Sequence, residues 1–85
     1  MTQWLTILGS TGSIGCSTLD VVRRHPERYR VYALTAARSI DVMAEQIAEF
    51  QPRFAVMSEP SAADTLRSFL PDHSETQVLS GVEAL

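Results

Sequence analysis

The chain has 85 residues with 45% hydrophobic and 20% charged side chains, which argues for a globular protein and against disorder, collagen or a membrane span. Its net charge is −3 and all seven basic residues are arginine, so the composition disfavours nucleic-acid or anionic-membrane binding and excludes chemistry that needs a lysine within these residues. One cysteine permits neither an internal disulfide nor a zinc site, and no signal peptide or membrane-spanning helix is expected, so the sequence predicts a cytoplasmic protein.

The first part of the chain predicts a strand, a helix and a second strand. The apolar run 4–8 ends at Gly9 and is typical of a buried strand. Apolar residues at helical spacing predict a helix over 13–24, which must stop before Pro26 because the residue that precedes a proline disfavours the α conformation. The β-branched and aromatic residues of 29–35 predict the second strand.

The rest of the chain continues the alternation. The expected elements are a helix capped by Ser39 that runs to about Phe50, a strand over 54–57, a helix from 61 to about 70, a strand over 77–79, and one helical turn over 81–85. The third helix is expected to begin with a capping box formed by Ser61 and Asp64.

This order, β-α-β-α-β-α-β, predicts an α/β fold with a parallel sheet, right-handed crossovers and helices on its faces, as in one half of a Rossmann-type dinucleotide-binding domain. The pattern stops in the middle of an element. Residues 1–85 are therefore expected to be the N-terminal part of such a domain, with the remaining domains absent from this chain.

A glycine-rich loop connects the first strand to the first helix, the context that a dinucleotide-binding loop requires. Gly9 permits a tight turn, Gly12 lets the backbone approach a pyrophosphate, and Gly15 lets the helix pack closely against the sheet. Three hydroxyl side chains add hydrogen-bond donors: Ser10, Thr11 and Ser13. No acid precedes Asp20, so the positive end of the helix stays available to a phosphate. This feature favours a phosphate-binding loop over the alternative of a flexible connection.

The end of the second strand predicts which dinucleotide binds. An acid there hydrogen-bonds the ribose of NAD, whereas an arginine accommodates the 2′-phosphate of NADP. This chain has no carboxylate at that point and carries Ala37, Arg38 and Ser39 instead, while Asp41 falls inside the next helix. Arg38 could be a solvated surface charge, but its place at the end of the second strand favours contact with a phosphate, which a forked guanidinium binds well. NADP is therefore preferred over NAD.

The other reactive side chains have structural explanations. Cys16 is expected to be a small buried residue of the first helix, and His25 to cap the end of that helix. His73 has no cysteine or histidine partner at ligand spacing. Hydride transfer also needs a proton donor and a substrate-holding group, and no such pair is found. The chain is expected to bind a cofactor and to contribute no catalytic or metal-ligating residue.

Residues 5–15, continued in register by Thr18, Leu19 and Asp20, closely resemble the N-terminus of the 1-deoxy-D-xylulose 5-phosphate reductoisomerases, and residues 52–57 fit the same family. The resemblance implies an NADPH-dependent homodimer that uses Mg²⁺ or Mn²⁺. Its reaction converts 1-deoxy-D-xylulose 5-phosphate, a sugar phosphate, to 2-C-methyl-D-erythritol 4-phosphate in the non-mevalonate isoprenoid pathway. By position it also implies two cofactor-binding segments: Thr11, Gly12, Ser13 and Ile14, then Ala37, Arg38 and Ser39.

The second segment departs from the family pattern, because many members have Gly-Lys-Asn where this chain has Ala37, Arg38 and Ser39. The positive charge is retained, but alanine no longer allows a positive φ at low cost. The metal-binding carboxylates and the substrate-phosphate site of the family are expected beyond residue 85. The sequence leaves two alternatives open, namely the NAD(P)-binding segment of an extended epimerase or dehydratase, and a nucleotide-sensing module without catalysis.

Overall fold

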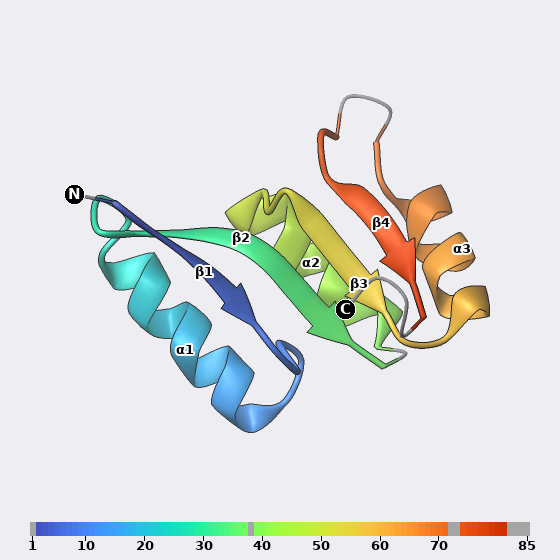
Figure 1. Ribbon diagram of the computed structural model, residues 1–85, viewed down its shortest axis with the longest axis horizontal. Helices are drawn as coiled ribbons and strands as arrows, with labels where there is room; N and C mark the ends of the chain where they lie inside the picture. The colour runs from blue at the N-terminus through green and yellow to red at the C-terminus, as the bar shows by residue number, and fades with distance from the viewer. Residues whose placement is uncertain (1, 38, 72–73, 82–85) are drawn as a thin grey trace.

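The computed structural model describes residues 2–37, 39–71 and 74–81 of the chain. Within these ranges, strands and helices alternate as the hydrophobic pattern predicts (Figure 1). In chain order the elements are β1 (Gln3–Ile7), α1 (Ser13–Arg24), β2 (Tyr29–Ala36), α2 (Ile40–Phe50), β3 (Phe54–Met57), α3 (Pro60–Phe69) and β4 (Gln77–Ser80). Each strand and helix predicted between residues 4 and 79 is therefore present, with ends that differ from the predicted ones by at most one residue.

The strands form one parallel sheet in which they follow one another in chain order, β1-β2-β3-β4 (Figure 1). Leu34 in the middle of the sheet pairs with Ile7 on one side and with Ala55 on the other. Because all the strands are parallel, their carboxyl ends lie at the same edge, and the loops that follow β1 and β2 are neighbours there. The predicted α/β class with a parallel, Rossmann-type sheet is confirmed.

The hydrophobic core lies between the helices and one face of the sheet. Each helix contributes a side chain that is at most 2% exposed, namely Leu19 of α1, Met43 of α2 and Leu66 of α3. Leu34 and Met57 meet them from the sheet and are fully buried. Burial of one such side chain stabilises the fold by about 1.5–3 kcal/mol, so these contacts hold the helices in place.

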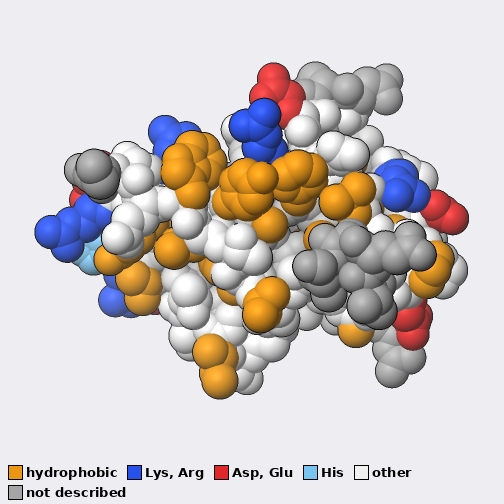
Figure 2. Space-filling view, in the orientation of Figure 1, with side chains coloured by type: hydrophobic (Ala, Val, Ile, Leu, Met, Phe, Trp, Pro, Cys, Tyr) orange, Lys and Arg blue, Asp and Glu red, His pale blue; other side chains and the backbone are white. Residues whose placement is uncertain are grey.

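The opposite face of the sheet carries exposed aromatic side chains. Trp4 of β1 precedes Leu5, which packs against the core, and is itself 61% exposed, while Tyr32 of β2 is 41% exposed. The Tyr32 ring makes an edge-to-face contact with Phe54, with 5.4 Å between the ring centroids. Figure 2 shows hydrophobic side chains gathered across the strands on this face. The helices therefore cover only one side of the described sheet.

The start of α3 differs from the prediction. The helix begins at Pro60, with Glu59 in the N-cap position, so Ser61 lies inside the helix and the expected capping box does not form. Asp64 instead accepts a hydrogen bond from Arg67 at 2.6 Å. The physical reason is Pro60, whose fixed φ suits the first helical position and starts the helix before the serine.

The chain after β4 leaves the sheet at Gly81, which has a positive φ of 77°. The helical turn predicted beyond it falls on residues 82–85, which lie outside the described residues. No helix in the described part of the chain has the length and apolar character that crossing a membrane requires.

Candidate functional site

The glycine loop after β1 packs tightly against the start of α1. Gly9 has a φ of 65°, which a residue with a side chain rarely adopts. A Cβ atom on Gly15 would lie 2.4 Å from the Gly9 carbonyl oxygen and 2.6 Å from the Ser10 Cα atom, so only glycine fits there. The expected roles of these two glycines, the tight turn and the close helix approach, are confirmed.

The start of α1 offers unpaired backbone donors to solvent. Gly12 is the N-cap and makes no side-chain cap hydrogen bond, and the first turn of the helix contains no acidic residue. Among the described residues, no acceptor pairs with the backbone N–H groups of Thr11, Ser13 and Ile14. Gly12, Ser13 and Ile14 are exposed, and Ile14 is 84% exposed. Free N–H groups at an uncompensated helix N-terminus form the arrangement that binds a phosphate group.

One expected donor of the loop is not available at this surface. Ser10 is fully buried, and its hydroxyl has no hydrogen-bond partner among the described residues. The prediction that Ser10 presents its hydroxyl to a ligand is therefore wrong. The reason is the turn at Gly9, after which the Ser10 N–H donates to the Thr35 carbonyl oxygen at 2.8 Å and the side chain lies beneath the loop.

The second predicted segment follows β2 at the same edge of the sheet. Ala37 and Ser39 are exposed, and Ala37 does not have a positive φ, so alanine is accommodated at this position without backbone strain. Ser39 is the N-cap of α2, as predicted, but its hydroxyl makes no cap hydrogen bond. Arg38, the predicted 2′-phosphate contact, lies outside the described residues.

Two residues outside the glycine motif connect the loop to the elements behind it, and the sequence analysis did not identify either one. The Thr35 hydroxyl of β2 accepts a hydrogen bond from the Gly9 N–H at 2.9 Å. The Gln46 side-chain amide of α2 donates to the Ser10 carbonyl oxygen at 2.8 Å. A signal for Gln46 was present, since it is a polar residue three positions after the core residue Met43 and therefore lies near the buried face of the helix.

The predictions for the remaining reactive side chains are confirmed for His25 and wrong for Cys16. Cys16 is exposed, so its expected burial is wrong, although its thiol reaches the Ser10 carbonyl oxygen at 3.6 Å. His25 is the C-cap of α1, as predicted, through its backbone N–H. His73 lies outside the described residues. No group of three or more histidine, cysteine or acidic side chains in the described ranges is placed to hold a metal ion, so these residues do not fit a magnesium site.

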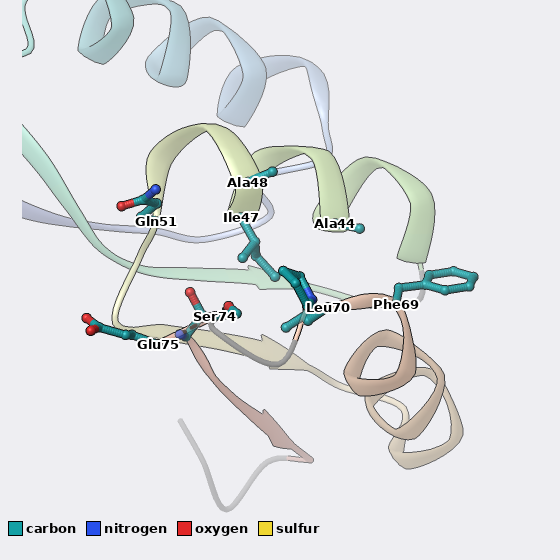
Figure 3. A pocket seen from close by; sticks show the side chains of 10 residues that line it. Ala44, Ile47, Ala48, Gln51, Phe69, Leu70, Ser74 and Glu75 are labelled. Atoms are coloured by element: carbon teal, nitrogen blue, oxygen red, sulfur yellow. Dashed lines mark hydrogen bonds between the residues drawn. The ribbon is translucent and has the colours of Figure 1, made fainter.

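A hollow of about 520 Å³ lies between α2, the end of α3 and the segment that precedes β4 (Figure 3). Its lining includes Ile47, Leu70 and Thr76. Thr76 precedes β4 and lies at the amino edge of the sheet, where its hydroxyl donates to the Pro52 carbonyl oxygen at 2.6 Å. The hollow is therefore at the edge opposite the glycine loop. Among the described residues that line it, Glu75 is the one titratable side chain, so these residues offer no catalytic pair.

Comparison with known proteins identifies relatives that share this architecture. Residues 5–85 match the 1-deoxy-D-xylulose 5-phosphate reductoisomerase family. The chain is 57% identical over 82 residues to the 1-deoxy-D-xylulose 5-phosphate reductoisomerase of Aeromonas salmonicida, a match that covers 95% of this chain and 21% of the relative. The chain thus spans about a fifth of the length of the curated relatives it matches.

Solved structures give the same result. The reductoisomerase of Zymomonas mobilis in complex with NADPH superposes with a TM-score of 0.91 at 37% identity, covering 99% of this chain and 22% of that protein. A reductoisomerase in complex with NADPH, fosmidomycin and magnesium superposes with a TM-score of 0.89 at 42% identity, covering 96% of this chain and 20% of that protein. These matches agree with the observed fold, and the chain belongs to the 1-deoxy-D-xylulose 5-phosphate reductoisomerase family.

Proposed function

We propose that this chain is the N-terminal part of the NADPH-binding domain of a reductoisomerase that converts 1-deoxy-D-xylulose 5-phosphate to 2-C-methyl-D-erythritol 4-phosphate. The observation that carries the proposal is the start of α1, where exposed backbone N–H groups and the absence of an acid leave a phosphate-binding end. Family membership over residues 5–85 supports it, as does the NADPH complex of the Zymomonas mobilis relative.

In this proposal the two segments at the carboxyl edge of the sheet divide the cofactor between them. The N–H groups of the glycine-loop segment, made up of Thr11, Gly12, Ser13 and Ile14, bind the pyrophosphate. Ala37, Arg38 and Ser39 surround the 2′-phosphate, with Arg38 as its charged partner. When bound, NADPH supplies the hydride for the reduction. The residues of this chain bind and orient the cofactor without taking a proton or an electron pair.

The rest of the active site is proposed to lie outside the 85 residues. Magnesium is present in the complex of one relative, and the described residues of this chain offer no cluster of ligands for it. We therefore assign the Mg²⁺ or Mn²⁺ ligands and the sugar-phosphate site to parts of the protein beyond this chain. A homodimer is proposed from membership of the family alone. A cytoplasmic location is proposed from the low cysteine content alone.

The preference for a 2′-phosphate can be tested by titrating 2′,5′-ADP and 5′-AMP into the protein as its gene encodes it. A charge-assisted contact is worth about 1.5–3 kcal/mol, so 2′,5′-ADP is expected to bind at least about tenfold more tightly. Arg38→Ala should remove that preference and leave the affinity for 5′-AMP unchanged. Arg53→Ala is the matched control, because Arg53 is an exposed arginine next to the start of β3 at the other edge of the sheet. Equal affinities for the two nucleotides would refute the assignment.

A further inference from the structure

The peptide that joins Ser10 to Thr11 is held from behind by a side chain of α2. The Gln46 Nε2 atom donates to the Ser10 carbonyl oxygen at 2.8 Å, and Gln46 is only 8% exposed. Because this carbonyl oxygen also accepts the Cys16 thiol at 3.6 Å, it points between α1 and α2, into the interior. The contact joins residues 36 positions apart in the sequence, so it belongs to the tertiary structure.

The orientation of this carbonyl determines the orientation of the next N–H group. A trans peptide is planar, and its C=O and N–H groups point in opposite directions. No cis peptide is present among the described residues. Since the Ser10 oxygen points inward, the Thr11 N–H points outward, to the side on which Gly12 and Ser13 are exposed. It has no acceptor among the described residues and is available to a ligand.

The burial of Gln46 has an energetic cost that local structure does not explain. Its Oε1 atom is buried and has no hydrogen-bond partner within the described ranges. Leaving such an acceptor unpaired costs about 1–3 kcal/mol, whereas an apolar side chain of similar size would pack between Met43 and Ile47 without that cost. Among the described residues, the fixed orientation of the Ser10–Thr11 peptide is the benefit that offsets the cost of the unpaired Gln46 oxygen.

We propose that Gln46 is a positioning residue for the glycine loop. It holds the Ser10 carbonyl inward and thereby aims the Thr11 N–H at the pyrophosphate. Thr35 anchors the same loop one residue earlier, through the Gly9 and Ser10 N–H groups. The loop is therefore ordered before the cofactor arrives, and binding does not have to supply the free energy of ordering it. This inference rests on the proposed function, since it takes the ligand to be a dinucleotide.

The test replaces Gln46 with methionine, which has a similar volume and no donor, in the protein as its gene encodes it. Loss of one hydrogen bond to the loop is expected to raise the Kd for NADPH about tenfold. The KM for NADPH should rise in parallel while kcat at saturating cofactor stays within about twofold, because Gln46 acts only through the loop. In the cofactor-free protein, hydrogen exchange should accelerate at the amides of residues 9–12 and remain unchanged in β3. Gln77→Met is the control, since Gln77 is exposed.

Each outcome of these experiments supports or contradicts the positioning role of Gln46. Unchanged affinity and unchanged loop exchange in Gln46→Met would overturn the positioning role. If the unsubstituted protein does not bind NADPH, the proposed function fails, and with it the claim that Gln46 aims an N–H group at the pyrophosphate. Faster loop exchange in Gln46→Met would then still show that Gln46 orders the loop. Gln46→Glu keeps the shape and replaces the donor with an oxygen, so it should weaken binding as well. Global unfolding of both variants would mean that Gln46 serves stability instead.

Discussion

Two glycines of the loop differ in what a side chain would meet. A Cβ on Gly15 would lie within 2.9 Å of three backbone atoms of Gly9 and Ser10, and backbone atoms cannot move aside as a flexible side chain can. A Cβ on Gly12 would approach only the Gly9 carbonyl oxygen, at an ordinary 3.4 Å. Gly15 is therefore required for packing, whereas Gly12 leaves space on the side where the cofactor is proposed to bind.

Alanine substitutions should separate these two roles. Gly15→Ala is expected to lower the free energy of unfolding by about 1–3 kcal/mol, since α1 must move away from the loop. Gly12→Ala should cost less than about 1 kcal/mol of stability but weaken NADPH binding, because its methyl group would lie between the backbone and the pyrophosphate. Urea unfolding and cofactor titration measure the two effects. Wild-type stability in Gly15→Ala would contradict the close approach of α1 to the loop.

At the scale of whole elements, an ion pair joins the exposed sides of α1 and α2. The Arg23 guanidinium donates to both carboxylate oxygens of Glu49, with the Nη2 to Oε1 distance at 2.8 Å, and it also pairs with Asp20 at 3.2 Å. The same group lies 5.4 Å from the centre of the Phe50 ring. The hydrogen bond from Arg23 lowers the pKa of Glu49 below its ordinary value, and the bond to Glu49 raises the pKa of Arg23.

This pair predicts a pH dependence with a definite sign. Because the pKa of Glu49 is lower in the folded than in the unfolded chain, its contribution to stability is present above the unfolded value of about 4.3 and is lost as the pH falls through the folded pKa. Arg23→Gln should reduce stability slightly at pH 7 and remove this part of the acid dependence. Both groups are exposed, so about 1 M salt should weaken the effect.

The midpoints of urea unfolding at pH 7 and at pH 3 measure the contribution of the Arg23–Glu49 pair to the acid dependence of stability. Arg24→Gln is the control, because Arg24 pairs with Asp20 but not with Glu49. An acid dependence that is the same in Arg23→Gln and in the unsubstituted chain would disprove the coupling.

For the molecule as a whole, the described fold leaves apolar surface and strand edges open. In the described ranges β1 pairs only with β2, and the sheet face that carries Trp4 and Tyr32 has no helix over it. An unpaired strand edge beside exposed aromatic side chains favours pairing with another chain. A domain of 85 residues also buries only a little over ~60% of its unfolded surface, so its own stability is small.

The 85-residue chain is therefore expected to associate in a concentration-dependent way. Replacing both Trp4 and Tyr32 with lysine should shift it toward the monomer, since charge on the sheet face opposes stacking and edge pairing. Phe69→Lys, which removes a comparably exposed aromatic ring from α3, should leave association unchanged. Size-exclusion chromatography with light scattering measures the mass. A monodisperse monomer that unfolds cooperatively would argue against this expectation.

The sequence by itself determined the order of elements and the glycine loop, because these depend on interactions between residues that are close in the chain. The parallel sheet followed from that order, since strands that alternate with helices are joined by crossover connections. Apolar periodicity located α1 and β3 to the residue, and the turn at Gly9 and the close packing at Gly15 followed from their place between a strand and a helix. The lack of an acid at the start of α1 could also be seen directly in the sequence.

Only the tertiary structure decided which groups of the loop face a ligand. The hydrogen bonds of Thr35 to Gly9 and of Gln46 to Ser10 join residues 26 and 36 positions apart. They arise because the carboxyl ends of β1 and β2 are adjacent and α2 packs behind them, and no local pattern specifies such a meeting. For the same reason the sequence assigned Ser10 to the ligand side and Cys16 to the interior, whereas the packing of α1 against the loop buries Ser10 and exposes Cys16.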